Sequence, residues 1–407
     1  MKTKLLILII FLLSGFSSYS QVFSGDLPGI DSFWTNDAVT AYIEDLYNDG
    51  DSILHITGVF RKVNNIDANK ICSWDGSEII FYGSDTGIDG FPNCVQMYND
   101  TLYIGGQFYN YNDPSRNYLT IWNGESWQGS AAGQPRGPIW DMCLYNGKLC
   151  IAGNFTYIGE QNYGRIALYD GAEWENIGDL GTLAYAVESF NGDLLYAGGH
   201  YSYGIKKYLG GTDWETFEDT PNDFLFCLKA DTFNTFLYAG GMFTHMGNLR
   251  SRGIVMWDGF KWNSMHYEYG STVAKKAIAI YRGDVYTGNN FTYDEATDTY
   301  NYFIARWDGE SWDSIGGNFN STIGAIEVFR DEIYIGGYFR TYNGGQRNKG
   351  LVKLTMPDNG CNYIKPRINT FADTVYLGSG ASTGSATAEA LALSIAEVSF
   401  FNNNPYV

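Results

Sequence analysis

The sequence predicts an all-β fold, a seven-bladed β-propeller closed by a strand from the N-terminus. A G-x-F corner or a close variant recurs seven times, 42 to 48 residues apart. A period in the 40s built from short strands is typical of propeller blades. Apolar residues alternate with a period of two inside each unit, which argues against helical repeats. The corner aromatics are Phe60, Phe108, Phe155, Tyr201, Phe243, Phe291 and Phe339.

Composition supports this fold class. The chain is 17% aromatic and has 49 Gly but only 9 Pro in 407 residues. Large ring-packed interfaces and many turns between short strands would produce these values. One propeller and a short further segment account for the length.

Residues 1–20 have the features of a secretory signal peptide. Lys2 and Lys4 precede an apolar run from Leu5 to Leu13, and small residues stand before Gln21. The run is too short to remain as a membrane span, and no Cys at the cleavage point offers a lipid anchor. We therefore expect a secreted, extracellular or cell-surface protein whose mature chain does not insert into a membrane.

Each unit is expected to contain four strands, a to d from the inside outward. In the second unit, strand b covers residues 102–107, strand c covers 119–122, and the Asn123-Gly124 turn leads to strand d at Trp127. Asn-Gly and related pairs also join strands a and b, as in tight hairpins. Strand d carries an aromatic shortly after the strand c aromatic, at Trp127, Trp174, Trp214, Trp262 and Trp312.

The ends of the array predict how the ring closes. The last unit stops near Leu354 without a strand d Trp, which would leave a bare edge. Trp34 lies 26 residues before Phe60, close to the 27 to 29 residues found in other units. Residues 31–36 are therefore expected to complete the seventh blade beside residues 349–354. Ten of the 11 Trp then occupy repeat positions, and Trp140 is left without one.

Charge and cysteines narrow the class of protein. The formal charge is −19, and −21 once Lys2 and Lys4 are removed. Basic residues form no cluster, so nucleic acid and acidic membranes are not expected partners. Cys143 and Cys150 flank the Asn146-Gly147 turn and should face each other, either as a disulfide or as small buried apolar residues.

These repeats resemble Kelch-like, galactose-oxidase-type propellers. They are more similar to the secreted propellers of bacteria that use type IX secretion, and to fungal cell-polarity marker propellers. The resemblance covers residues 31–354 and implies the fold. It implies no copper site, because His55, His200, His245 and His266 are scattered over different blades. Residues 355–363 are expected to form a linker, and residues 364–407 resemble the first strands of a PKD-type immunoglobulin-like module that is incomplete here.

Propeller geometry places the a–b and c–d turns on one face and the b–c and d–a loops on the other. The first set is short and the second is long and varied, so we call the second side the long-loop face. Its Tyr and Asn residues would suit sugar rings and hydroxyl groups, and a surface protein is the other candidate ligand. The candidate ligand-binding residues are Tyr109, Tyr111, Asn112, Tyr157, Tyr163, His245, Tyr293, Tyr300, Tyr342 and Asn343.

The expected function is therefore a monomeric binding or adhesion module, with an extracellular glycan or surface protein as partner. No catalytic residue, cofactor or metal site is predicted, although a polysaccharide-active enzyme and a structural component of an extracellular assembly stay open. Acidic groups at Asp294, Glu295 and Asp298, or at Asp85 and Asp89, could serve glycoside hydrolysis. They could also bind Ca²⁺, but no D-x-D-x-D-G spacing occurs.

Overall fold

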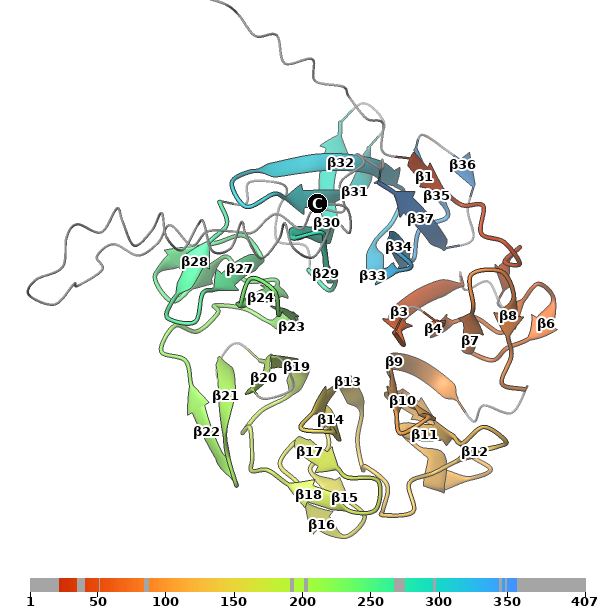
Figure 1. Cartoon of the computed structure of the whole chain (residues 1–407), viewed down its shortest axis with the longest axis vertical. Helices are drawn as coiled ribbons and strands as arrows, with labels where there is room; N and C mark the ends of the chain where they lie inside the picture. Colours follow the sequence, from red (N-terminus) through yellow and green to blue (C-terminus); the bar gives the residue numbers. More distant parts are fainter. Residues whose placement is uncertain are drawn as a thin grey trace, which may run out of the picture.

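Seven four-stranded antiparallel sheets stand around a central axis in the computed structural model, as Figure 1 shows. The structure describes residues 22–34, 41–50, 52–83, 88–190, 194–200, 204–266, 275–295, 298–343, 346–347 and 350–356. Within these ranges no α-helix occurs, and none of the described segments is a helix that could cross a membrane. The predicted all-β, seven-bladed propeller is confirmed.

The first four blades follow the chain, each with its inner strand first. Blade one contains β3 (Tyr42–Asn48), β4 (Leu54–Val59), β7 (Ile71–Trp74) and β8 (Ile79–Ile80). Blade two contains β9 (Asp89–Tyr98), β10 (Thr101–Tyr109), β11 (Leu119–Trp122) and β12 (Trp127–Gln128). Blade three contains β13 (Ile139–Tyr145), β14 (Lys148–Gly153), β17 (Ile166–Tyr169) and β18 (Trp174–Asn176). Blade four contains β19 (Ala184–Phe190), β20 (Leu194–Gly199), β21 (Ile205–Gly210) and β22 (Asp213–Thr216).

The remaining three blades follow the same plan, except that the last takes its outer strand from the N-terminus. Blade five contains β23 (Leu225–Asp231), β24 (Phe236–Gly241), β27 (Ile254–Trp257) and β28 (Trp262–Ser264). Blade six contains β29 (Ile278–Tyr281), β30 (Asp284–Asp294), β31 (Thr299–Trp307) and β32 (Trp312–Phe319). Blade seven contains β33 (Ile323–Phe329), β34 (Glu332–Gly337), β37 (Leu351–Thr355) and β1 (Val22–Ser24).

Several b–c loops are ordered by short hairpins of their own. These hairpins are β5 (Lys62–Val63) with β6 (Ile66–Asp67), β15 (Tyr157–Ile158) with β16 (Gln161–Asn162), β25 (His245–Met246) with β26 (Leu249–Arg250), and β35 (Thr341–Tyr342) with β36 (Gln346–Arg347). The corresponding loop of blade two holds the 3-10 helix η1 (Pro114–Arg116). The long-loop face is therefore built largely from fixed backbone.

The aromatic repeat positions pack as the sequence predicts. The strand c and strand d aromatics stand directly opposite each other, as in the pairs Trp122 with Trp127 and Trp257 with Trp262. Adjacent blades share their cores, since Tyr103 of blade two and Tyr169 of blade three lie 6.2 Å apart between ring centroids. Burial of these rings supplies much of the stabilisation between blades.

The prediction that residues 31–36 close the ring is wrong. The segment that pairs with β37 is β1, with Phe23 opposite Leu354. Phe23 is 8% exposed and packs in the core beside Phe319. The backbone of Trp34 instead belongs to β2 (Phe33–Trp34), which pairs with the β5–β6 hairpin of blade one. Spacing between Trp residues therefore misplaced the strand, because the closing position is occupied by a Phe.

A hydrogen bond between neighbouring blades explains the real closure. The indole N–H of a strand d Trp donates to a backbone carbonyl just after strand d of the preceding blade, as Trp127 does to Tyr82 at 2.8 Å. Equivalent bonds join Trp174 to Gly133, Trp214 to Ile177, and Trp312 to Met265. Blade one has Ile79 at this position, and Trp74 of strand c bonds the Pro28 carbonyl that follows β1. The same type of bond therefore joins blade one to blade seven.

The remaining sequence predictions concern the cysteine pair and the two ends of the chain. Cys143 and Cys150 face each other in the β13–β14 register as expected, and both are buried free thiols. The predicted signal peptide (1–20) and the PKD-like segment (364–407) lie outside the described residues.

Candidate functional site

A β-bulge near the start of the inner strand recurs from blade to blade. In β13 the register passes from Ile139 to Asp141, so that Trp140 has no partner in the ladder. Blades one, four, five and seven show the same shift near the start of strand a, and blade two shows it at Asn93 within the longer β9. A bulge redirects the extra side chain and is common beside functional sites. The extra residues are Glu44, Asn93, Trp140, Tyr185, Phe226 and Gly324, and Lys276 takes the matching place just before β29.

These seven residues, which we call the bulge ring, line a central cavity of about 700 Å³. The inner strands of all seven blades contribute to its wall. The bulges lie at the start of strand a, beside the d–a loops, so the bulge ring surrounds the end of the cavity at the long-loop face. A volume of 300 to 1,000 Å³ is the usual range for small-molecule sites. The cavity is therefore large enough for a ligand of several rings.

On one side of this mouth Trp140, Tyr185 and Phe226 line the cavity and Phe224 packs against two of them, and we call these four residues the aromatic arc. The ring centroids of Trp140 and Tyr185 are 5.3 Å apart, and those of Tyr185 and Phe226 are 5.6 Å apart. All four side chains are half-buried, so each keeps part of its ring accessible. The indole N–H of Trp140 is buried and has no hydrogen-bond partner among the described residues. The arc therefore offers partly accessible aromatic surface.

The opposite side of the mouth is polar. The Lys276 ammonium lies 3.6 Å from a carboxylate oxygen of Glu44. The Tyr338 hydroxyl donates to the other Glu44 oxygen at 3.4 Å, and the Tyr338 ring stacks on Tyr42. Aromatic and charged groups are thus separated onto two sides of one opening.

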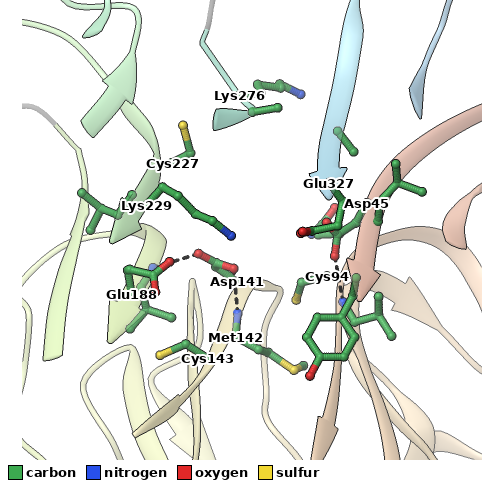
Figure 2. Close-up of a pocket in the computed structure, with 18 of the residues that line it drawn as sticks. Asp45, Cys94, Asp141, Met142, Cys143, Glu188, Cys227, Lys229, Lys276 and Glu327 are labelled. Atoms are coloured by element: carbon green, nitrogen blue, oxygen red, sulfur yellow. Dashed lines mark hydrogen bonds between the residues drawn. The ribbon is translucent and has the colours of Figure 1, made fainter. Parts of the chain in front are cut away.

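Carboxylates line the cavity one to three residues further along the inner strands, and Figure 2 shows Asp45, Asp141 and Glu327 extending into the same space as Lys229. Asp45 accepts a hydrogen bond from the Val95 N–H at 3.0 Å. Asp141 accepts hydrogen bonds from two backbone N–H groups, those of Met142 and Val187, each at 2.9 Å. These bonds tie the inner strands of blades one and three to the blades that follow them.

Burial controls the titration of these groups. It raises the pKa of Asp141 to about 7 and that of Glu188 to about 7, and it raises the pKa of Asp45 well above its ordinary value. The nearby Glu327 carboxylate is the main cause that raises the pKa of Lys229 to about 12. Lys229 is therefore a fixed cation, whereas Asp141 and Glu188 change charge near neutral pH. No group of three His, Cys, Asp or Glu suited to a metal occurs among the described residues.

The residues predicted from the sequence lie elsewhere on the propeller. None of the ten lines the central cavity. Exposed on the long-loop side are Tyr109, Tyr111, Asn112, Tyr157, His245, Tyr293, Tyr300 and Asn343. Tyr163 and Tyr342 are each 5% exposed, and their hydroxyls bond the Trp174 carbonyl and the Gly25 N–H. The Tyr163 hydroxyl thus bonds the start of β18, and the Tyr342 hydroxyl bonds the segment that follows β1.

The exposed members form local pairs on separate blades. Tyr109 contacts Tyr118 in blade two, and Tyr293 contacts Tyr300 in blade six. The Tyr293 hydroxyl also donates to Asp298 at 2.6 Å. Of the predicted residues, the structure therefore pairs Tyr293 with Tyr300, and it does not gather the ten into one site.

The acids considered for catalysis are also outside the cavity wall. Asp89, Glu295 and Asp298 are exposed on the surface. Asp85 and the side chain of Asp294 lie outside the described residues.

The sequence did contain one signal for the bulge ring. Trp140 was the Trp that no repeat position explained, and the structure places it in the cavity mouth. The other ring members could not be recognised, since a bulge leaves no fixed residue type and the seven positions all differ. Their variation is itself consistent with a site, because packing positions in the same strands repeat.

No family model matches the sequence, and no curated protein matches it. Solved structures do resemble the fold. The extracellular domain of a putative hybrid two-component system from B. thetaiotaomicron aligns with a TM-score of 0.54 at 12% identity, over 80% of this chain and 39% of that chain. This chain therefore spans about two fifths of that domain. Virginiamycin B lyase from Staphylococcus aureus aligns with a TM-score of 0.53 at 12% identity, over 83% of this chain and 100% of that chain. At these identities the likeness shows the propeller fold alone.

Proposed function

We propose that this protein is a secreted binding module that takes a carbohydrate at the mouth of its central cavity. The observation that supports the proposal is the bulge ring, in which one residue from each blade lines one opening, with a side chain from every blade except blade seven, where the residue is Gly324. Repeat positions elsewhere in the blades are occupied by the same residue types. The bulge ring is where seven similar blades differ, and a specific ligand requires such differences.

The chemistry of the mouth suits a sugar. The apolar faces of pyranose rings stack on aromatic side chains, and the aromatic arc provides several such faces. Glu44 and Asn93 can then exchange hydrogen bonds with hydroxyl groups. The exposed Tyr pairs on the loops of blades two and six would extend the surface for a longer chain.

Binding to a glycan array tests this proposal. Replacing the arc residue Phe226 by Ala should weaken binding at least tenfold, on the order of the 1.4 kcal/mol expected for one stacking platform. The matched control is Phe233→Ala, which removes an exposed Phe from the a–b turn of blade five, on the opposite face. Wild-type affinity in both variants would move the site away from the cavity mouth. Binding to surface proteins but to no glycan would favour the protein-ligand alternative.

The same assay addresses the enzyme and assembly alternatives. We propose that the chain binds without turnover, so no reducing ends should appear when it is incubated with the bound polysaccharide. Product release that survives Phe226→Ala but is lost on replacing Glu295 would support a polysaccharide-active enzyme. Self-association without any ligand would support a structural role.

A further inference from the structure

We propose that the cavity mouth prefers glycans that carry protonated amino groups, such as glucosamine oligomers, over their neutral counterparts. This inference rests on the proposed function and names the ligand class for the same site. Three features of the described residues carry it: the imbalance of charge in the cavity, the position of the acids on the strands that bear the aromatic arc, and the partly exposed rings of the arc.

The charges that face the cavity do not balance. The acidic groups are Glu44, Asp45, Asp141, Glu188 and Glu327, whereas the basic groups are Lys229 and Lys276. Lys276 is paired with Glu44 at the mouth. Lys229 acts mainly with Glu327, whose charge is the leading cause of its raised pKa. Asp45, Asp141 and Glu188 also interact with Lys229, so these three carboxyl groups share that one ammonium group with Glu327.

Two of these acids belong to the strands that bear the arc. Asp141 directly follows Trp140 on β13, and Glu188 follows Tyr185 by three residues on β19. The arc and these acids thus line the same side of the cavity, at successive depths. A sugar stacked on the arc would direct its substituents toward the carboxyl groups of Asp141 and Glu188.

An ammonium group can interact favourably with both the aromatic arc and the carboxylates. A cation is attracted to the face of an aromatic ring, most strongly to Trp, and this attraction grows where water is excluded. The same cation supplies the countercharge that a buried carboxylate lacks. A neutral acetamido or hydroxyl group gains neither effect, so the amino form should bind more tightly.

Proton release accompanies such binding. Around Glu188 the facing groups are Asp141 and the Cys143 thiol on β13, Lys229 on β23 and Glu327 on β33. Burial holds part of the Asp141 and Glu188 population in the protonated form at mildly acidic pH. An ammonium placed beside them favours the ionised form, so binding at pH 6 should release protons to the buffer.

Titration calorimetry on the full chain at pH 6 tests the inference. The probes are β-1,4-linked glucosamine trisaccharide and its fully N-acetylated counterpart, each measured in two buffers of different ionisation enthalpy. We expect the amino form to bind at least tenfold more tightly and to release protons. Glu188→Gln should reduce this preference to within about threefold and reduce the proton release. Asp100→Asn, which removes one charge from an exposed a–b turn, should leave the preference unchanged.

The outcomes separate this inference from the proposed function. If the N-acetylated trisaccharide binds as tightly as the amino form or more tightly, the preference is wrong and glycan binding stands. If Asp100→Asn lowers the preference as much as Glu188→Gln, the attraction is a general effect of the acidic surface and the inference is wrong. If neither trisaccharide binds, and the array shows no other glycan, the carbohydrate function falls together with this inference.

Discussion

The ammonium of Lys276 in blade six reaches the carboxylate of Glu44 in blade one, at 3.6 Å, across the inner strand of the blade that stands between them. Blade seven allows this contact because its bulge residue is Gly324, which has no side chain. Even a Cβ atom at Gly324 would lie 2.7 Å from the carbonyl oxygen of Ile43. The absence of one side chain therefore creates the polar side of the mouth.

Replacing Gly324 by Ala should lower the free energy of unfolding by about 1–3 kcal/mol. The new Cβ meets backbone of the neighbouring strand, which cannot rotate away as a side chain can. Denaturant unfolding measures the change. Gly198→Ala is the control, since the nearest atoms to its Cβ are side-chain carbons at 3.3 Å, and its effect should be below about 1 kcal/mol. Equal losses in the two variants would contradict the packing argument.

The Trp hydrogen bonds between blades should be measurable by comparing two matched variants. Trp127→Phe removes the N–H that bonds the Tyr82 carbonyl, and we expect a loss of about 2 kcal/mol of unfolding free energy. Trp262→Phe removes a buried N–H that has no partner among the described residues. Removing the free-energy cost of burying that N–H should offset much of the packing energy that the smaller ring loses. Its loss should be under about 1 kcal/mol, by guanidinium unfolding. A larger loss for Trp262→Phe would show that ring packing alone holds the blades together.

The closing strand can be tested at Phe23. Phe23→Ala should cost about 3 kcal/mol, because the ring is buried against Phe319 where β1 completes blade seven. Phe33→Ala should cost clearly less, since Phe33 is only half-buried and β2 lies outside the four-stranded blades. Thermal unfolding of the two variants measures which substitution destabilises the protein more. The ranking would have to reverse if residues 31–36 closed the ring.

Lys275 should make the free energy of unfolding increase as the pH rises above about 7. Its ammonium is buried against the Asn289 carbonyl and the Asn290 side chain, and burial lowers its pKa from the ordinary 10.5 to about 7. Between these values the unfolded chain binds a proton that the folded chain does not, so this group makes stability rise with pH by about 1.4 kcal/mol per unit.

The test compares unfolding free energies from pH 7 to pH 9 in two neighbouring variants. Lys275→Met should lose the alkaline gain, so that the wild type improves relative to it as pH rises. Lys276→Met, at the adjacent exposed lysine, should run parallel to the wild type. A parallel course for Lys275→Met as well would show that the folded chain protonates Lys275 normally.

Much of the fold could be predicted because repetition reports on packing. The recurring Phe corners and paired aromatics gave the number of blades and the order of strands, since every blade must fill the same wedge of space. Phe23 was missed because closure depends on which segment can reach β37 and bury a ring there. That is a long-range contact, and no local residue type marks it.

The candidate site likewise has features that the sequence predicts and features that depend on long-range contacts. The sequence by itself determined seven similar blades, a long-loop face, and one unexplained residue at Trp140. Only the tertiary structure decided that seven residues far apart in the chain, of seven different types, surround one opening. The physical reason is that a β-bulge is a property of strand register, which many residues tolerate, whereas a cavity wall is assembled only when the ring of blades is closed.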